Sequence, residues 1–112
     1  MTKAKGAFYV LKRNGYVAAY ISLIINARAK NLWVYSIAVH PNEREKKYAQ
    51  SLIDKTVEYA KLNQLKKVTL EVKVSNFVAI KLYEKNSFVA IAIKQNYYHD
   101  GSDAYYMRLL IE

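Results

Sequence analysis

Residues 68–88 read VTLEVKVSNFVAIKLYEKNSF, a sequence that predicts a buried strand, a short turn at 74–76 and an amphipathic helix. Glu71 lies inside the apolar strand, where burying a carboxylate is costly unless it has a partner or a chemical role. Helical spacing places Asn76 and Tyr83 on one face of the helix. The segment therefore predicts a carboxylate, an amide and a phenol that are presented together by one strand and one helix.

The rest of the chain supplies the other elements of a mixed sheet. Asn14-Gly15 lies between two β-rich segments and is a strong hairpin signal. The expected elements are strands at 7–12, 16–25 and 32–39, a helix at 44–63, a strand at 67–73, a helix at 76–86, and strands at 88–94 and 104–111. A helix between the third and fourth strands requires a parallel crossover. The predicted fold class is α+β, in the order β-β-β-α-β-α-β-β, with residues 1–112 forming one domain.

Composition narrows the class of protein. The chain has 112 residues, of which 53% are hydrophobic, and this suits one domain with a real core. No apolar run reaches the length of a membrane span, and the first six residues do not resemble a leader peptide. The chain has no cysteine, so it has no disulfides or cysteine-based zinc sites, and two distant histidines give no metal signature. These features predict a cytoplasmic protein with no metal and no membrane partner.

The net charge of +9, from 18 Lys+Arg against 9 Asp+Glu, would attract polyanions such as nucleic acid, acidic peptides or a phosphorylated cofactor. A lysine-rich surface is more simply explained by genome composition or a hot environment. The basic residues are scattered through the chain, without the aromatic interleaving that is typical of single-strand binders. A nucleic-acid partner is therefore supported by charge alone.

Several motifs in the right order carry a family resemblance. Residues 44–49 read REKKYA at the start of the first expected helix, residues 70–84 contain LEVKVSN and LYE, and residues 97–107 read YYHDGSDAYYM. Together they resemble the GNAT superfamily of N-acetyltransferases, especially its RimI-like and archaeal branch, which acetylates protein N-termini. The resemblance runs from about Tyr9 to Leu109. It implies a truncated GNAT fold, because family members normally have one more strand and two helices before the first three strands found here.

The resemblance implies acetyl-coenzyme A as cosubstrate. The backbone of Ile37, Ala38 and Val39 would line the acetyl group and the pantetheine arm, and the Asn76 side chain would hydrogen-bond the pantetheine. Free backbone N–H groups and the helix dipole would hold the pyrophosphate at the start of the first helix. The residues of this loop and helix start are Arg44, Glu45, Lys46, Lys47, Tyr48, Ala49 and Gln50.

Two positions depart from the family pattern. Lys47 stands where the loop usually has a glycine, and Asn86-Ser87 stand where a glycine commonly precedes the phenylalanine. If position 47 needs a positive φ, a side chain there costs about 1–2 kcal/mol. If it is an ordinary helical position, lysine is better than glycine by about 1 kcal/mol. The sequence leaves both possibilities open.

The resemblance also implies catalytic roles. Glu71 would accept the proton of the attacking amine, directly or through water, and Tyr83 would protonate the leaving thiolate as general acid. Tyr97 and Tyr98 would clamp the first residues of the acceptor.

Each of these residues also has a purely structural interpretation. Glu71 could be an outward strand residue paired with Lys73 or Lys66. Tyr83 could belong to the core, and Asn76 could be only a helix N-cap. Tyr97 and Tyr98 could pack against the strand expected at 104–111.

The predicted function is acetyl transfer from acetyl-coenzyme A to a primary amine, most simply the N-terminal α-amino group of a protein. The rival hypothesis is a catalytically silent GNAT-like fold that serves as a binding or dimerisation module. Retention of Glu71, Asn76 and Tyr83 favours the enzyme, whereas Lys47 and the shortened N-terminal part favour the silent fold. Apolar sheet surface that the absent elements would cover predicts a homodimer.

Overall fold

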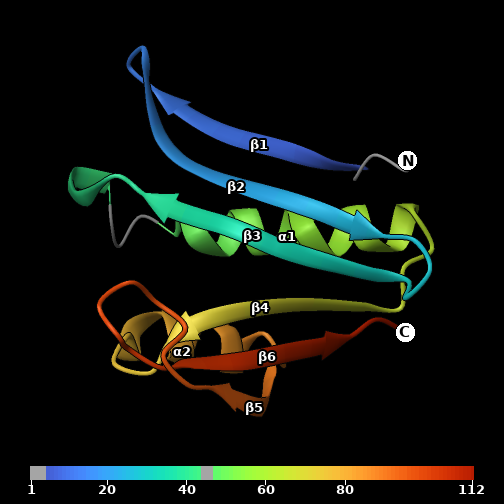
Figure 1. The fold of residues 1–112 in the computed structure, drawn as a ribbon. Helices are drawn as coiled ribbons and strands as arrows, with labels where there is room; N and C mark the ends of the chain where they lie inside the picture. Colours follow the sequence, from blue (N-terminus) through green and yellow to red (C-terminus); the bar gives the residue numbers. More distant parts are fainter. Residues whose placement is uncertain (1–4, 44–46) are drawn as a thin grey trace.

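The computed structural model describes residues 5–43 and 47–112, which form a six-stranded mixed sheet with two helices (Figure 1). The sheet order is β1-β2-β3-β4-β6-β5. This confirms the expected fold class and the expected order of elements. The elements are β1 (Lys5–Arg13), β2 (Tyr16–Asn26), β3 (Asn31–Val39), a short 3-10 helix (Pro41–Glu43), α1 (Tyr48–Leu62), β4 (Lys67–Lys73), α2 (Phe77–Lys85), β5 (Val89–Lys94) and β6 (Ala104–Leu110).

The first three strands form an antiparallel meander that begins at the predicted hairpin. Asn14 and Gly15 have φ of 51° and 84°. Two consecutive positive φ values are what a type I′ turn requires, and asparagine and glycine adopt them at low cost. The Asn-Gly signal therefore correctly placed the tightest turn of the sheet.

Both helices cover the same face of the sheet. β3 and β4 are parallel and neighbouring, and β4 and β5 point the same way with β6 between them. Right-handed connections between such strands bring both helices to one side, and both lie behind the sheet in Figure 1. The buried residues of α1 are Leu52, Ile53, Thr56 and Ala60, which recur at helical spacing.

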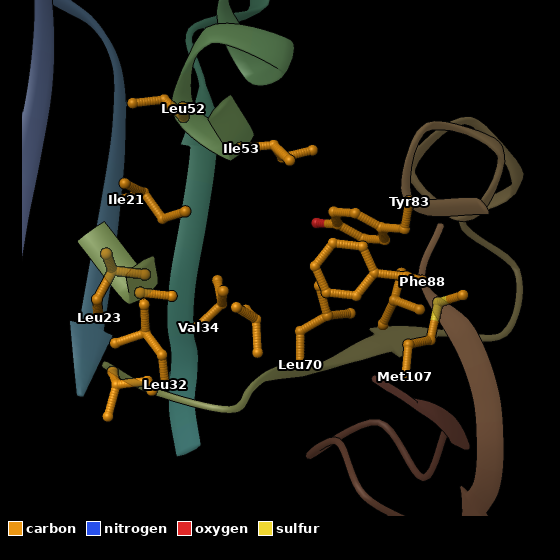
Figure 2. Close-up of a cluster of buried hydrophobic side chains, with 14 of the residues drawn as sticks. Ile21, Leu23, Leu32, Val34, Leu52, Ile53, Leu70, Tyr83, Phe88 and Met107 are labelled. Carbon is orange, nitrogen blue, oxygen red and sulfur yellow. The ribbon is translucent and has the colours of Figure 1, made fainter. Parts of the chain in front are cut away.

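The core lies between these helices and the sheet (Figure 2). Along β4, Leu70 and Val72 belong to this core, so strand alternation directs Glu71 and Thr69 to the opposite face. We call the first the helix-covered face. Among the described residues no helix packs on the opposite side, which we call the open face. The open face carries Phe8, Tyr20, Trp33, Glu71 and Tyr106, as the strand pairing places them.

Within the described part of the chain, neither helix is long and apolar enough to span a bilayer.

Candidate active site

A cleft opens where β3 and β4 separate. Their parallel ladder joins Asn31–Val34 to Lys67–Leu70, and beyond these pairs the two strands diverge (Figure 1). The pairing of β3 with β2 shifts at the same place, and Tyr35 is the extra residue of the bulge. The resulting cleft has a volume of about 580 Å³. It is lined by Val34, Tyr35, Ser36, Ile37, Leu70, Glu71, Val72, Lys73, Ser75, Asn76, Tyr83 and Tyr98.

The cleft brings together residues that the sequence singled out from three separate motifs. Ile37 comes from β3, Glu71 from β4, Asn76 and Tyr83 from the start and body of α2, and Tyr98 from the loop before β6. Glu71 reaches the cleft from the open face, whereas Tyr83 reaches it from the helix-covered face. Ala38 and Val39 continue β3 past the cleft lining, and Tyr97 is 41% exposed beside Tyr98.

Tyr83 is both a core residue and a cleft residue. Its side chain is 5% exposed, and its hydroxyl points from α2 toward the middle of the sheet (Figure 2). Burial, with a smaller contribution from Tyr98, raises the pKa of Tyr83 to about 12. Burial opposes the phenolate because a charge loses its hydration in an apolar site. The phenol therefore keeps its proton at any physiological pH.

The end of α2 fixes Tyr83 in place. The Phe88 N–H donates to the Tyr83 carbonyl at 3.0 Å, and the Ser87 N–H donates to the Glu84 carbonyl at 3.0 Å. These two bonds are the Schellman pattern of a helix C-terminus, and the rings of Tyr83 and Phe88, 5.7 Å apart, make its usual apolar contact. Ser87 has a φ of 73°, a conformation that glycine normally supplies.

Glu71 is held by two partners on the open face. Trp33 Nε1 donates to Oε1 at 2.7 Å, and Lys94 Nζ lies 2.5 Å from Oε2. The sequence suggested that Glu71 could pair with Lys73 or Lys66, and that choice of partner was wrong. Glu71 pairs with Lys94, and Lys73 pairs with Asp100 at 2.9 Å. The sequence could not indicate this partner, because Lys94 lies on β5, two strands away from β4, and only the order of strands in the sheet brings it over Glu71.

Asn76 has the structural role that the sequence allowed. Its Oδ1 accepts a hydrogen bond from the Ala79 N–H at 3.3 Å, which caps the N-terminus of α2. The residue also lines the cleft, so the cap orients a side chain that faces the candidate site.

Tyr97 and Tyr98 form a perpendicular ring pair at the rim, with centroids 5.0 Å apart. Burial is the main cause that raises the pKa of each phenol. Lysines lie over both rings, with Lys73 Nζ 5.3 Å from the Tyr98 centroid and Lys94 Nζ 5.5 Å from that of Tyr97. The pair therefore forms an aromatic edge between two cations.

The start of α1 decides the question left open at position 47. Lys47 has φ 61° and ψ 21°, which is the left-handed region, and it is the N-cap of α1. The helix begins at Tyr48, later than expected from the sequence, and Arg44, Glu45 and Lys46 lie outside the described residues. A first-turn N–H has no intrahelical acceptor, so this end remains suited to an anion.

Gln50 has a structural contact that the sequence did not suggest. Its side-chain amide exchanges two hydrogen bonds with that of Asn86, at 2.7 and 2.8 Å. Because Asn86 is the C-cap of α2, this pair ties the first turn of α1 to the end of the helix that carries Tyr83.

The β1–β2 hairpin contributes residues near the start of α1 that the sequence reasoning missed. Arg13 Nη1 donates to the Tyr48 hydroxyl at 3.1 Å, and Arg13 Nε lies 3.7 Å from Glu43 Oε1. The Tyr16 hydroxyl also donates to Glu43, which is buried. The hairpin thus places a guanidinium beside the first residue of α1. Only the antiparallel meander, and no local motif, could have indicated this.

Three residues around Glu71 were also missed: Trp33, Lys94 and Tyr106. The expected parallel pairing of the strands at 32–39 and 67–73 could have indicated Trp33, because this pairing places its side chain on the same face of the sheet as Glu71. Tyr106 is the direct cross-strand partner of Glu71 on β6. Finding it from the sequence would have required the register of the last strand.

Comparisons with known proteins agree on one family. A sequence model of the acetyltransferase (GNAT) family matches residues 1–88. The N-alpha-acetyltransferase of Saccharolobus solfataricus is 41% identical over 75 residues, covering 66% of this chain and 45% of that protein. The ribosomal protein bS18-alanine N-acetyltransferase of Escherichia coli K12 is 32% identical over 107 residues, covering 92% and 70%.

The fold agrees with these relatives. The crystal structure of Ard1 from Thermoplasma volcanium superimposes with a TM-score of 0.88 at 30% identity, covering 94% of this chain and 70% of that one. The matched region thus spans from under half to about 70% of the length of these three proteins.

Proposed function

Because the chain belongs to the acetyltransferase (GNAT) family, we propose that it transfers the acetyl group of acetyl-coenzyme A to the N-terminal α-amino group of a protein. The observation that carries the proposal is the meeting of Glu71 and Tyr83 in one cleft from opposite faces of β4. An amine can then approach from one side of the sheet and a thioester from the other. The relatives named for N-terminal acetylation support this choice of acceptor.

The residues present fit acetyl-coenzyme A, which supplies the activated acetyl thioester when it is bound. Where β3 diverges from β4, the backbone of Ile37, Ala38 and Val39 would line the acetyl group and the pantetheine arm, and an N–H that β4 no longer pairs can polarise the thioester carbonyl and stabilise the negative charge that builds on its oxygen. The first turn of α1, with Lys47 and Arg13 nearby, suits the pyrophosphate. Arg44, Glu45 and Lys46 would complete that loop, with Tyr48, Ala49 and Gln50 following.

Glu71 would act as the base. An N-terminal ammonium has a pKa of about 7.7–8.0 and must lose its proton before it attacks a carbonyl. A carboxylate that is 7% exposed and fixed by Trp33 can accept that proton, directly or through one water.

Tyr83 would act as the acid. Since burial keeps its pKa at about 12, the phenol is protonated when the thiolate leaves and can donate to the sulfur. Asn76 would hold the pantetheine amide. Tyr97 and Tyr98 would clamp the first residues of the acceptor at the cleft rim.

Localisation and assembly are finer proposals. We place the protein in the cytoplasm, and we propose a homodimer because the open face exposes large apolar side chains, among them Phe8 at 63% and Tyr35 at 58%. A monomeric mass in solution scattering at micromolar concentration would contradict the dimer.

The function is tested by titration calorimetry with acetyl-coenzyme A, followed by a thiol-release assay with the peptide amide Ala-Ala-Ala-Ala. We expect heat of binding at micromolar cofactor and release of free thiol only when the peptide is present. The N-acetylated peptide is the matched control and should give no release. Cofactor binding without any peptide-dependent release across varied N-terminal residues would contradict the acceptor class, and absence of binding would contradict the enzyme.

A further inference from the structure

Lys94 lies where a cationic acceptor would have to bind. Its Nζ is 2.5 Å from Glu71 Oε2, 4.5 Å from the ring centroid of Tyr106 and 5.5 Å from that of Tyr97. A carboxylate flanked by aromatic faces is the environment in which proteins bind ammonium groups. The cage formed by Glu71, Tyr97 and Tyr106 is therefore already occupied by an ammonium of the chain itself.

The two oxygens of Glu71 are held in different ways. Trp33 Nε1 occupies Oε1 from a neighbouring strand in the sheet, and the Glu71 side chain is 7% exposed. Lys94 occupies Oε2 from β5, and its side chain is 43% exposed. The tryptophan is built into the sheet, whereas the lysine reaches Glu71 from the edge strand with a half-exposed side chain that can move into solvent. The Lys94 contact is thus the replaceable one.

We propose that the Lys94 ammonium is a built-in placeholder for the acceptor ammonium, which displaces it from the cage of Glu71, Tyr97 and Tyr106. The inference rests on the proposed function and names its acceptor subsite: a site for a free, protonated primary amine. Two ammonium groups cannot share one carboxylate oxygen without strong repulsion, so the acceptor binds only when Lys94 has left.

The consequence for affinity follows from competition. If Lys94 closes the cage for about nine-tenths of the time, the apparent Kd of the acceptor is about tenfold above that of the free cage. Replacing Lys94 with an uncharged residue should therefore tighten acceptor binding, because the acceptor ammonium no longer competes with the lysine for Glu71. If Lys94 had only a structural role, its replacement would weaken acceptor binding or leave it unchanged.

The chain contains its own reporter for this test. Trp33 is the only tryptophan and donates to Glu71, so its fluorescence responds to what binds that carboxylate. The probe is the peptide amide Ala-Ala-Ala-Ala, titrated at pH 7 without acetyl-coenzyme A, against its N-acetylated form. The variants are Lys94→Met and, as matched control, Lys55→Met, because Lys55 is also half-exposed, paired with Glu58 and placed over a ring, that of Tyr9.

We expect the free peptide to bind Lys94→Met about three- to tenfold more tightly than the wild type, with Lys55→Met unchanged. Lys94→Arg should bind no better than the wild type, because a guanidinium also pairs with the carboxylate. The N-acetylated peptide should show no such gain. Equal or weaker binding of the free peptide to Lys94→Met, an equal gain in Lys55→Met, or no preference for the free amine would overturn the placeholder.

The cofactor titration separates this result from failure of the proposed function. Acetyl-coenzyme A should bind Lys94→Met and wild type alike, and its thiol release tests transfer independently of the cage. Tighter binding of the free peptide to Lys94→Met without any thiol release would support the subsite and contradict the enzyme. Normal turnover with no tightening would support the enzyme and overturn the subsite.

Discussion

On the helix-covered face of β4, Leu70 and Val72 lie in an apolar core beside Tyr83, whereas on the open face Glu71 lies among Trp33, Lys94 and Tyr106. The covered side keeps a proton on a phenol by removing water. The open side holds a carboxylate between a cation and an N–H donor. One strand thus separates the environments of the proposed acid and the proposed base, because its alternate side chains face opposite sides of the sheet.

The strongest test of this contrast removes one proposed proton-transfer group from each face. Tyr83→Phe and Glu71→Gln should each lower kcat by about 10²–10⁴, because a positioned acid or base contributes an effect of that size. The thiol-release assay gives kcat, and calorimetry should show cofactor binding within about twofold of the wild type for Tyr83→Phe. Tyr9→Phe and Glu58→Gln, which make the same chemical changes away from the cleft, are the controls. An unchanged rate in either cleft variant would show that its assigned role is wrong.

The next effect is on stability. Leu70→Ala should lower the free energy of unfolding by about 2–5 kcal/mol, since the side chain is 2% exposed and its loss leaves a cavity. Phe8→Ala on the open face should cost no more than about 0.5 kcal/mol in a monomer, because Phe8 is 63% exposed. Urea denaturation monitored by circular dichroism measures both. A large, concentration-dependent cost for Phe8→Ala would instead show that a second copy covers the open face.

A third test uses the pKa of the buried phenol. Burial raises the pKa of Tyr83 from 10 to about 12, so the native state binds its proton more tightly than the unfolded chain does. The resulting stability is fully present below pH 10 and is lost as the pH rises from 10 through 12, by about 2–3 kcal/mol in total. The unfolding free energy of the wild type minus that of Tyr83→Phe should fall over that pH range. The titration of the other tyrosines and of the lysines is common to both proteins and cancels in this difference. A flat difference would indicate that water reaches the hydroxyl.

The covered side of this comparison was largely predictable from the sequence. Hydrophobic periodicity gave both helices and the order of the elements along the chain, and a motif gave Asn76 and Tyr83, which line the cleft. The same motif also gave Glu71, which enters the cleft from the open face. Those signals are local, because the residues of each lie within one element or in two consecutive elements. The Asn14-Gly15 turn was predictable for the same reason, because its two residues alone determine its conformation.

The open side was much less predictable. The Glu71–Lys94 contact joins residues from strands that are not consecutive in the sheet, and the bulge at Tyr35 has no sequence signature. The positions with left-handed backbone conformation were also not predictable, because most of them are not occupied by glycine. Lys47, Gln64 and Ser87 have φ of 61°, 57° and 73°, where a glycine would have marked the helix ends directly.

The smallest expected effect concerns how the helices are fixed on the covered face. Ser87→Gly should raise the free energy of unfolding by about 0.5–1 kcal/mol, because relief of the positive φ outweighs the added freedom of the unfolded chain. Gln64→Gly, at the equivalent position after α1, is the matched control: the Gln64 and Leu65 N–H groups donate to Lys61 and Ala60 in the same pattern.

Lys47→Gly separates strain from function at the other end of α1. It should give a similar gain in stability but weaken acetyl-coenzyme A binding several-fold, because it removes a cation at the helix end where we propose that the pyrophosphate binds. Thermal unfolding and cofactor calorimetry, at low and high salt, measure the two effects separately. If Lys47→Gly were destabilising while Ser87→Gly and Gln64→Gly were stabilising, position 47 would not hold a positive φ in solution. If cofactor affinity were unchanged at both salt concentrations, the lysine would lie too far from the phosphates to interact with them, and the anion would depend on the backbone N–H groups of α1.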